Sequence, residues 1–170
     1  RSVQVTFNPS ATGASSALLT LRSVNDPDST SAEVALSGAG VSPTIDIGLA
    51  GADYSLNFGS VRRIDSLASR QFELTNSGTD RATIDGLNLD NLTFGSVLLG
   101  SSELEPGETT IVEVTFGPQT IGPHEGTLVV TGDLGHPGGT DSLFVYLSGH
   151  GTSPRLSLHP TSYTFPNLTI

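Results

Sequence analysis

The chain of 170 residues contains no Cys, no Met and no Trp, and its 17 acidic residues against seven basic ones give a net charge of −10. The absence of Cys excludes disulfides, zinc–thiolate sites and thiol nucleophiles, and the negative charge disfavours nucleic acid and anionic membrane surfaces as partners. No apolar run approaches the roughly 20 residues that a membrane-spanning helix needs, so with 20 Gly and 10 Pro we expect an all-β, soluble, exported protein without membrane insertion.

Short segments of alternating apolar residues follow one another along the chain and predict strands. These segments are Tyr54–Phe58, Phe72–Leu74, Val112–Phe116, Leu128–Val130 and Leu143–Leu147. Turn signals separate them, including Asn76–Gly78 and the pair Pro106–Gly107, which suits a type II turn. Between Ala82 and Leu89 the alternation is irregular, and a bulge near Gly86 would let Ile84 and the later Leu residues all face the core. We therefore predict two stacked antiparallel sheets.

The chain contains a repeat: it reads VQVTFNPSATGASSALLTL from Val3 and VEVTFGPQTIGPHEGTLVV from Val112. The copies stay in frame through Gly13 and Gly122, and two extra residues in the turn Gly132–Asp141 shift the frame of the later matches. A period of roughly 110 residues is the size of one immunoglobulin-like sandwich, so each period is expected to be a whole domain.

This period divides the chain into one complete module, residues 42–153, between two partial ones. Residues 1–41 would be the last three strands of a preceding module, and residues 154–170 the first strand of a following one. Residues 1–41 are too few to bury a core alone. Because Arg1 would stand in mid-domain and the chain has no Met, we expect a fragment. The expected fold class is an immunoglobulin-like β-sandwich in tandem repeats, with one complete copy flanked by partial copies.

An ordered series of short motifs runs through the complete module: FGSV from Phe58, FELTNSG from Phe72, Phe94, LEPGETTIVEVTFGP from Leu104, then GTLVVTGD and VYLSGHG. This series resembles ASH-type domains, a group of immunoglobulin-like modules that includes the abnormal-spindle and hydin type and the bacterial choice-of-anchor D repeats. The group is similar in fold to the major-sperm-protein and pilus-chaperone sandwiches. The resemblance implies a non-enzymatic module. The tandem form and the absence of Lys favour the bacterial branch, whose members occur in large exported or surface proteins.

The residues that could carry chemistry have plainer structural interpretations. The four His residues adjoin Gly or Pro and lack the spacing of a metal site or a catalytic triad; they are His124, His136, His150 and His159. The acidic turn Asn25–Asp28 lacks the order of an EF-hand loop. Neither Gly38-x-Gly40 nor Gly149-x-Gly151 precedes the helix of a phosphate loop, and we expect them to end the last strand of a module. We therefore expect no catalytic residue, no cofactor and no metal.

The two copies differ on the outward side of their last strand. Inward positions are apolar in both, whereas outward Glu33 and Ala35 of the first copy become Phe144 and Tyr146 in the second. Phe144 and Tyr146 are our candidate partner-docking residues, because aromatic side chains supply much of the energy of protein interfaces. The alternative is that a loop of the same domain, or the adjacent module, covers them.

The segments between modules are short and contain Pro. Val41–Pro43 and Thr152–Pro154 should hold successive modules in a fairly fixed orientation, since Pro restricts the preceding residue to extended conformations. Beyond them, residues 154–170 alternate apolar side chains at Leu156 and Leu158 and again at Tyr163 and Phe165. This tail either begins a third module or adds a strand to the sheet of a neighbouring subunit.

The expected function is that of a structural or adhesive repeat module in a large exported bacterial protein, acting as a semi-rigid spacer and a protein-docking surface. Its partners would be other protein subunits or neighbouring modules of the same chain, in a polymer or surface assembly, and its location the cell surface, the extracellular space or the periplasm. The alternative is a carbohydrate-binding accessory domain of a secreted enzyme, for which exposed aromatics beside Asp and Asn would be the sign. A hydrolase is a distant third.

Overall fold

The computed structural model describes residues 2–22, 31–51, 53–64, 66–135, 141–159 and 161–165. These residues form strands and loops and no helix, which confirms the predicted all-β class. The strands are β1 (Gly13–Arg22), β2 (Ser31–Gly40), β3 (Ile45–Ile47), β4 (Ser55–Arg62), β5 (Ala68–Asn76), β6 (Ala82–Leu89), β7 (Phe94–Leu98), β8 (Glu103–Leu104), β9 (Thr109–Phe116), β10 (Gly122–Asp133) and β11 (Asp141–Thr152). Accordingly, no helix of the described residues could span a membrane.

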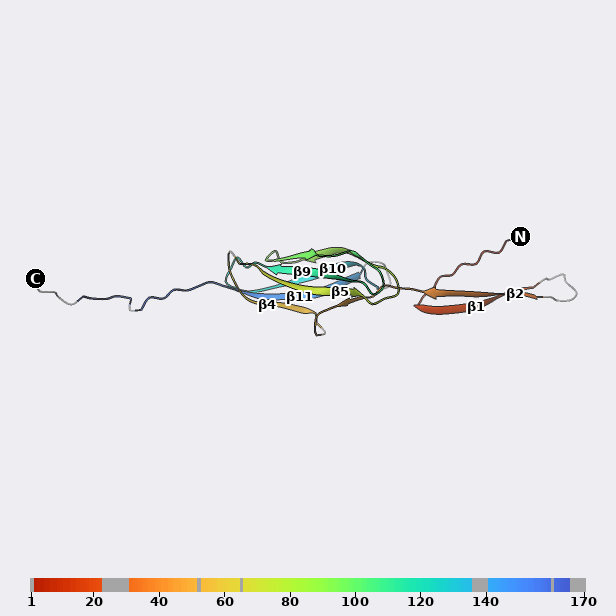
Figure 1. Ribbon diagram of the computed structural model, residues 1–170, viewed down its shortest axis with the longest axis horizontal. Helices are drawn as coiled ribbons and strands as arrows, with labels where there is room; N and C mark the ends of the chain where they lie inside the picture. The colour runs from red at the N-terminus through yellow and green to blue at the C-terminus, as the bar shows by residue number, and fades with distance from the viewer. Residues whose placement is uncertain are drawn as a thin grey trace, which may run out of the picture.

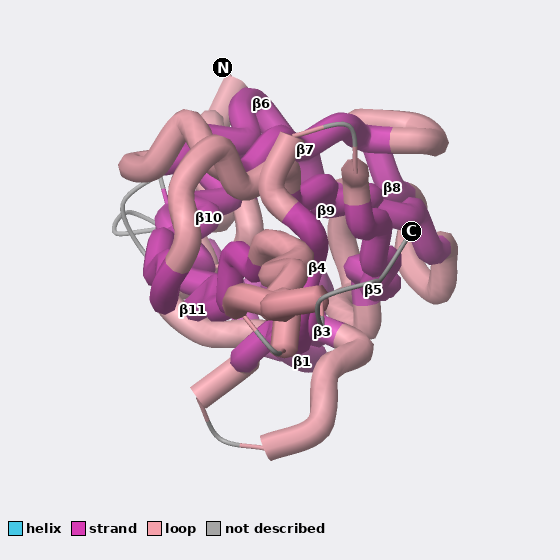
Figure 2. The backbone as a smooth tube through the Cα atoms, turned by 90° about the vertical axis from the view of Figure 1, so that its left-hand side faces the viewer, coloured by secondary structure: helices cyan, strands magenta, loops and turns pink. Residues whose placement is uncertain are grey.

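Strands β3 to β11 form a sandwich of two sheets (Figure 1). One sheet has the order β4-β11-β10-β6-β8 and the other the order β3-β5-β9-β7. Figure 2 looks along the long axis and shows β10 and β11 on one side of the sandwich and β5 on the other. The prediction of two antiparallel sheets is right except at β4, which pairs with β11 in parallel. This difference arises because β4 follows β3 of the opposite sheet, so no hairpin sets its direction.

The core lies between the two sheets and contains inward side chains that the alternation predicted, together with residues outside those segments such as Phe94 and Leu104. Its fully buried side chains include Leu74, Leu104, Val112, Val114, Phe116, Leu128, Val130 and Val145. At its centre Phe116 stacks on Phe94, with ring centroids 4.9 Å apart, and contacts Phe58 at 5.6 Å. Because Phe58 belongs to one sheet and Phe94 and Phe116 to the other, these rings join the two layers.

Two local predictions are confirmed in the strands and turns. In β6 the register shifts, so that Gly86 pairs with Thr131 and Ile84 with Gly132, which leaves Asp85 as the extra residue of a bulge. Ile84 before the bulge and Leu87 after it therefore both pack against the core. In the Pro106–Gly107 turn, Gly107 has a φ of 86° and the N–H of Glu108 donates to the carbonyl of Glu105 at 2.9 Å, as a type II turn requires.

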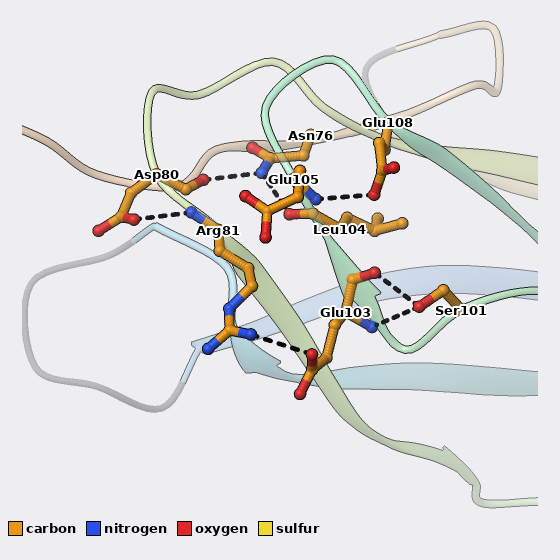
Figure 3. A network of polar contacts seen from close by, with 8 residues as sticks. All are labelled: Asn76, Asp80, Arg81, Ser101, Glu103, Leu104, Glu105 and Glu108. Carbon is orange, nitrogen blue, oxygen red and sulfur yellow. Dashed lines mark hydrogen bonds and ion pairs between the residues drawn. The ribbon is translucent and has the colours of Figure 1, made fainter.

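A buried polar residue, Asn76, ties three segments of the sandwich together (Figure 3). Its amide nitrogen donates to the carbonyls of Asp80 and Leu104, both at 2.8 Å. Its amide oxygen accepts from the backbone N–H groups of Gly78 at 3.0 Å and Thr44 at 3.3 Å. These bonds fix the turn after β5, the short edge strand β8 and the entry of the chain into the sandwich.

The hairpin of β1 and β2 lies beyond one end of the sandwich, and the tail lies beyond the other (Figure 1). Residues 2–9 form no strand, although the sequence suggested three strands before residue 41. In the sandwich the corresponding strand, β9, pairs with β5 and β7, and residues 2–9 have no such neighbours within the described chain. The described residues from 154 to 165 are also unpaired.

The connection between hairpin and sandwich is bound to the sandwich by hydrogen bonds. The N–H of Thr79 donates to the carbonyl of Ser42, and the N–H of Ser77 to the carbonyl of Thr44, both at 2.9 Å. Since β2 ends at Gly40, Val41 alone separates the hairpin from this anchored segment.

Candidate docking surface

The outer face of β11 carries the two aromatic residues that the sequence comparison singled out. Phe144 is 50% and Tyr146 53% exposed, whereas Val145 and Leu147, which alternate with them, are 0% and 2% exposed. The strand therefore points Phe144 and Tyr146 away from a core that is closed without them. The described residues of the same chain leave half of each side chain accessible.

Neighbouring strands extend this aromatic pair into a wider surface. Phe144 lies opposite Val129 of β10, and Val129 lies opposite Asn88 of β6. Tyr146 lies between Thr127 of β10 and Ser55 of β4. We call the pair Phe144 and Tyr146 the aromatic strip; small and hydroxyl-bearing side chains flank it on both sides.

A depression of about 390 Å³ adjoins Tyr146 on this face. Its lining residues are Ser55, Asp90, Glu125, Gly126, Thr127, Tyr146, Leu147 and Ser148. The N–H of Thr127 donates to Oδ1 of Asp90 at 2.7 Å, and the side-chain amide of Asn91 donates to the carbonyl of Glu125 at 2.8 Å. The depression thus combines one aromatic ring, two carboxylates and several hydroxyl groups.

Sequence reasoning missed Asp90 and Glu125 as members of this surface. Asp90 directly follows β6, and Glu125 lies in β10 before the part that pairs with β6, so the antiparallel pairing of those strands brings the two residues together. Neither residue belongs to a motif with fixed spacing, so the sequence offered no signal for the depression.

The residues considered for chemistry lie apart from one another. His124 packs edge-on against Phe116 with ring centroids 5.6 Å apart, His150 is exposed in β11, and His159 is exposed in the tail. In the described part of the chain, no three His, Asp or Glu side chains gather as a metal site would need. His136 and the acidic turn Asn25–Asp28 lie outside the described residues.

The Gly-x-Gly motifs serve close packing at the strand ends. A Cβ at Gly149 would meet the ring of Phe116, and a Cβ at Gly151 would meet the carbonyl oxygen of Thr120. Gly38 and Gly40 stand in the same relation to Phe7 and to the carbonyl of Ala11. Both motifs are therefore needed for backbone approach, which is a structural use of glycine.

Comparison with known proteins places the sandwich in a family. Residues 52–144 match the family model described as "HYDIN/CFA65/VesB-like, Ig-like domain". No curated protein sequence matches the chain. Among solved structures, the chain is similar to an ASH/PapD-like domain of human CEP192, with a TM-score of 0.54 and 20% identity, over 67% of this chain and 89% of that one.

Two bacterial structures are also similar. A Porphyromonas gingivalis W83 protein of unknown function matches with a TM-score of 0.53 and 12% identity, over 84% of this chain and 68% of that one. The Vibrio cholerae VesB protease matches with a TM-score of 0.43 and 19% identity, over 63% of this chain and 32% of that one. Because the family model spans more than half of the sequence, the resemblance to ASH-type modules is confirmed, and the chain belongs to the HYDIN/CFA65/VesB-like family of immunoglobulin-like domains.

Proposed function

We propose that the chain is a non-enzymatic segment of a larger protein, in which the sandwich acts as a spacer and docks another protein through the aromatic strip. The observation that carries this proposal is the half exposure of Phe144 and Tyr146 on a strand whose inward side chains already complete the core. Immunoglobulin-like domains of this type are typically non-catalytic, and the residues that line the depression include no nucleophile paired with a base.

The chemistry of the face supports a protein partner. Two adjacent aromatic side chains on the outer face of a sheet offer a large apolar contact area at a low cost in side-chain entropy. Asp90 and Glu125 line the depression beside Tyr146 and would favour a partner with Arg or Lys at the edge of the contact. The hairpin copy has Glu33 and Ala35 at the corresponding positions, so strand formation does not require aromatics there.

We further propose that the whole protein is exported by a bacterium and works at the cell surface, in the extracellular space or in the periplasm. Its partners would be other protein subunits or neighbouring modules of the same chain, in a surface or filament-associated assembly. The net charge of −10 and the lack of Lys support this setting, as does the resemblance to bacterial choice-of-anchor D repeats.

The docking proposal can be tested by photo-cross-linking in the cells that produce the protein. A photoreactive residue at position 146 should form an adduct with a defined protein, and the same residue at position 73 should not, because Glu73 is exposed on β5 of the opposite sheet. Equal adducts at both positions, or none at position 146, would contradict docking through the strip.

A second candidate function is carbohydrate binding, and the depression beside Tyr146 favours it. An aromatic ring next to carboxylates and hydroxyl groups can stack on a sugar ring and bond its hydroxyls. Titration with soluble oligosaccharides would then perturb the resonances of Tyr146 and Thr127, and Tyr146→Thr would abolish the response. A protein adduct at position 146 without any response to sugars would favour the docking function.

Residues 154–170 are assigned to the start of a following module, with addition to the sheet of a neighbouring subunit as the competing role. Leu156 and Leu158 are exposed and unpaired in the described part of this tail, which suits either role. Attaching a copy of residues 66–153 after Ile170 should protect the tail amides from hydrogen exchange if the tail begins a module. Protection in the unextended chain that depends on concentration would instead support strand addition.

A further inference from the structure

The hairpin and the segment before it expose an apolar surface that a folded protein rarely leaves open. Val3, Val5 and Phe7 are 51–62% exposed, and Leu21 and Val34 of the hairpin are 42% and 46% exposed. A groove of about 510 Å³ runs along this surface and is lined by Val5, Phe7, Ala17 and Leu36 among others. We call it the hairpin face.

The hairpin is built like the pair β10 and β11 of the sandwich. Their registers agree along the ladder, because Gly13 pairs with Gly40 as Gly122 pairs with Gly151, and Leu19 pairs with Val34 as Leu128 pairs with Val145. The contacts beside the ladder agree as well. Phe7 approaches Gly38 as Phe116 approaches Gly149, and the carbonyl of Ala11 approaches Gly40 as that of Thr120 approaches Gly151. Sequence repeat and local geometry therefore coincide.

The sandwich shows what covers this surface in a complete copy. Val112, Val114 and Phe116 correspond to Val3, Val5 and Phe7, and all three are fully buried. Strand β9 pairs with β5 along one side and with β7 along its other side. The rings of Phe58 and Phe94 pack on Phe116. The missing cover of the hairpin face is thus a set of strands equivalent to β3 to β8.

Other parts of this chain do not fit as the cover. The chain's own strands β3 to β8 already pack against β9 to β11 in the sandwich. Because Ser42 is bonded to the sandwich, only Val41 lies between it and the end of β2, which is too short for the hairpin to fold back onto those strands. The tail carries apolar pairs that correspond to β3 and β4 alone, Leu156 with Leu158 and Tyr163 with Phe165. It has no counterpart of Phe94 or of β5.

We propose that the hairpin face docks the front strands of another module of the same family, equivalent in sequence and order to residues 45–104 of this chain, and closes with them into a second sandwich. Val3, Val5 and Phe7 then form the strand that corresponds to β9. This interaction surface is separate from the aromatic strip and does not depend on it.

The test supplies the missing strands from the chain itself. Residues 42–111 are joined directly to Val3, so that Thr110 and Ile111 stand in place of Arg1 and Ser2. Because Ala17 corresponds to Gly126, where an added Cβ would lie 3.0 Å from the ring of Phe94, the extended chain is made with and without Ala17→Gly. Amide hydrogen exchange in β1 and β2 should slow by about 100-fold or more relative to the unextended chain.

A matched pair of substitutions distinguishes a closed core from accidental contact. Leu36→Asp should restore fast exchange in β1 and β2 of the extended chain, and in the unextended chain it should leave the exchange of the sandwich unchanged. Leu147→Asp, at the corresponding position of β11, should instead unfold the sandwich in both chains.

Three results would overturn the proposal. The first concerns a control chain, which is the extended chain with residues 112–152 in place of residues 3–41. The proposal fails if amide exchange is slow in those replacement strands of the control but fast in β1 and β2 of both extended chains. The second is insensitivity of the extended chain to Leu36→Asp. The third is slow exchange of β1 and β2 in the unextended chain together with sedimentation as a dimer, since a second copy would then be the occupant.

Discussion

Asn76 is a fully buried residue whose side-chain amide makes four hydrogen bonds, to Thr44, Gly78, Asp80 and Leu104. Strand β8 has only two residues, and its Leu104 is held by a bond from Asn76 as well as by pairing with Ala82. The exposed ion pair of Arg81 and Glu103, with N and O 3.0 Å apart, adds little at this site because exposed pairs are screened by water. The anchoring of this edge therefore combines the amide of Asn76 with the burial of Leu104 in the core.

Replacing Asn76 by Leu should destabilise the sandwich by about 3 kcal/mol, because two carbonyls and two N–H groups would lose a partner in or near the core. Urea denaturation of the full chain measures this change. Asn88→Ala, at an exposed position of β6, should change the free energy of unfolding by no more than about 0.5 kcal/mol. Equal effects of the two substitutions would show that Asn76 is not an anchor.

The sequence predicted the place of Asn76 but not its role. The letters NSG after an apolar alternation indicate a turn, and the turn is present at Asn76–Gly78. Burial of the amide depends on β8 and on Thr44, which lie 28 and 32 positions away along the chain. Local pattern carries no information about contacts at that separation.

Among the elements, β6 gives the sharpest case in which pattern determined structure. Ala82 and Ile84, at even-numbered positions, face the core, and so do Leu87 and Leu89, at odd-numbered positions. Because side chains alternate strictly along a strand, both pairs can face the core only if an extra residue lies between them.

Deleting Asp85 should therefore cost several kcal/mol, on the order of the burial of two large apolar side chains, because one half of β6 would turn its apolar residues outward. The unfolding midpoint in urea measures the effect. Asp85→Ser, which keeps the extra residue, should leave the midpoint nearly unchanged. A deletion variant as stable as the parent chain would mean that the bulge does not set the register.

The pattern failed where pairing is non-local. The parallel pairing of β4 with β11 and the depression that joins Asp90 to Glu125 follow from sheet order, which alternation alone does not encode. Sequence comparison between the copies, by contrast, located Phe144 and Tyr146 on the outward side. Inward positions stay apolar in both copies because the core requires it, whereas outward positions can differ.

At the scale of the molecule, the anchored connection predicts a fixed orientation of hairpin and sandwich. The chain has no Cys, so cysteines introduced at Ser16 and Glu73 would be the only sites for spin labels. The distance between the labels should show one narrow distribution. Inserting two glycines after Val41 should broaden it, because flexible residues would then precede the bonds of Ser42 to Thr79. A native distribution as broad as that of the insertion variant would contradict a semi-rigid spacer.

The most direct test of docking separates stability from association in one pair of variants. In the chain with Phe144→Thr and Tyr146→Thr, we predict a free energy of unfolding within about 1 kcal/mol of the parent, because neither ring fills the core. Adducts from a photoreactive residue at exposed Ser142, next to the strip on β11, should fall at least about tenfold, as expected for the loss of interface anchors. Loss of several kcal/mol of stability with undiminished adducts would contradict the account, since the aromatics would then serve the fold and not a partner.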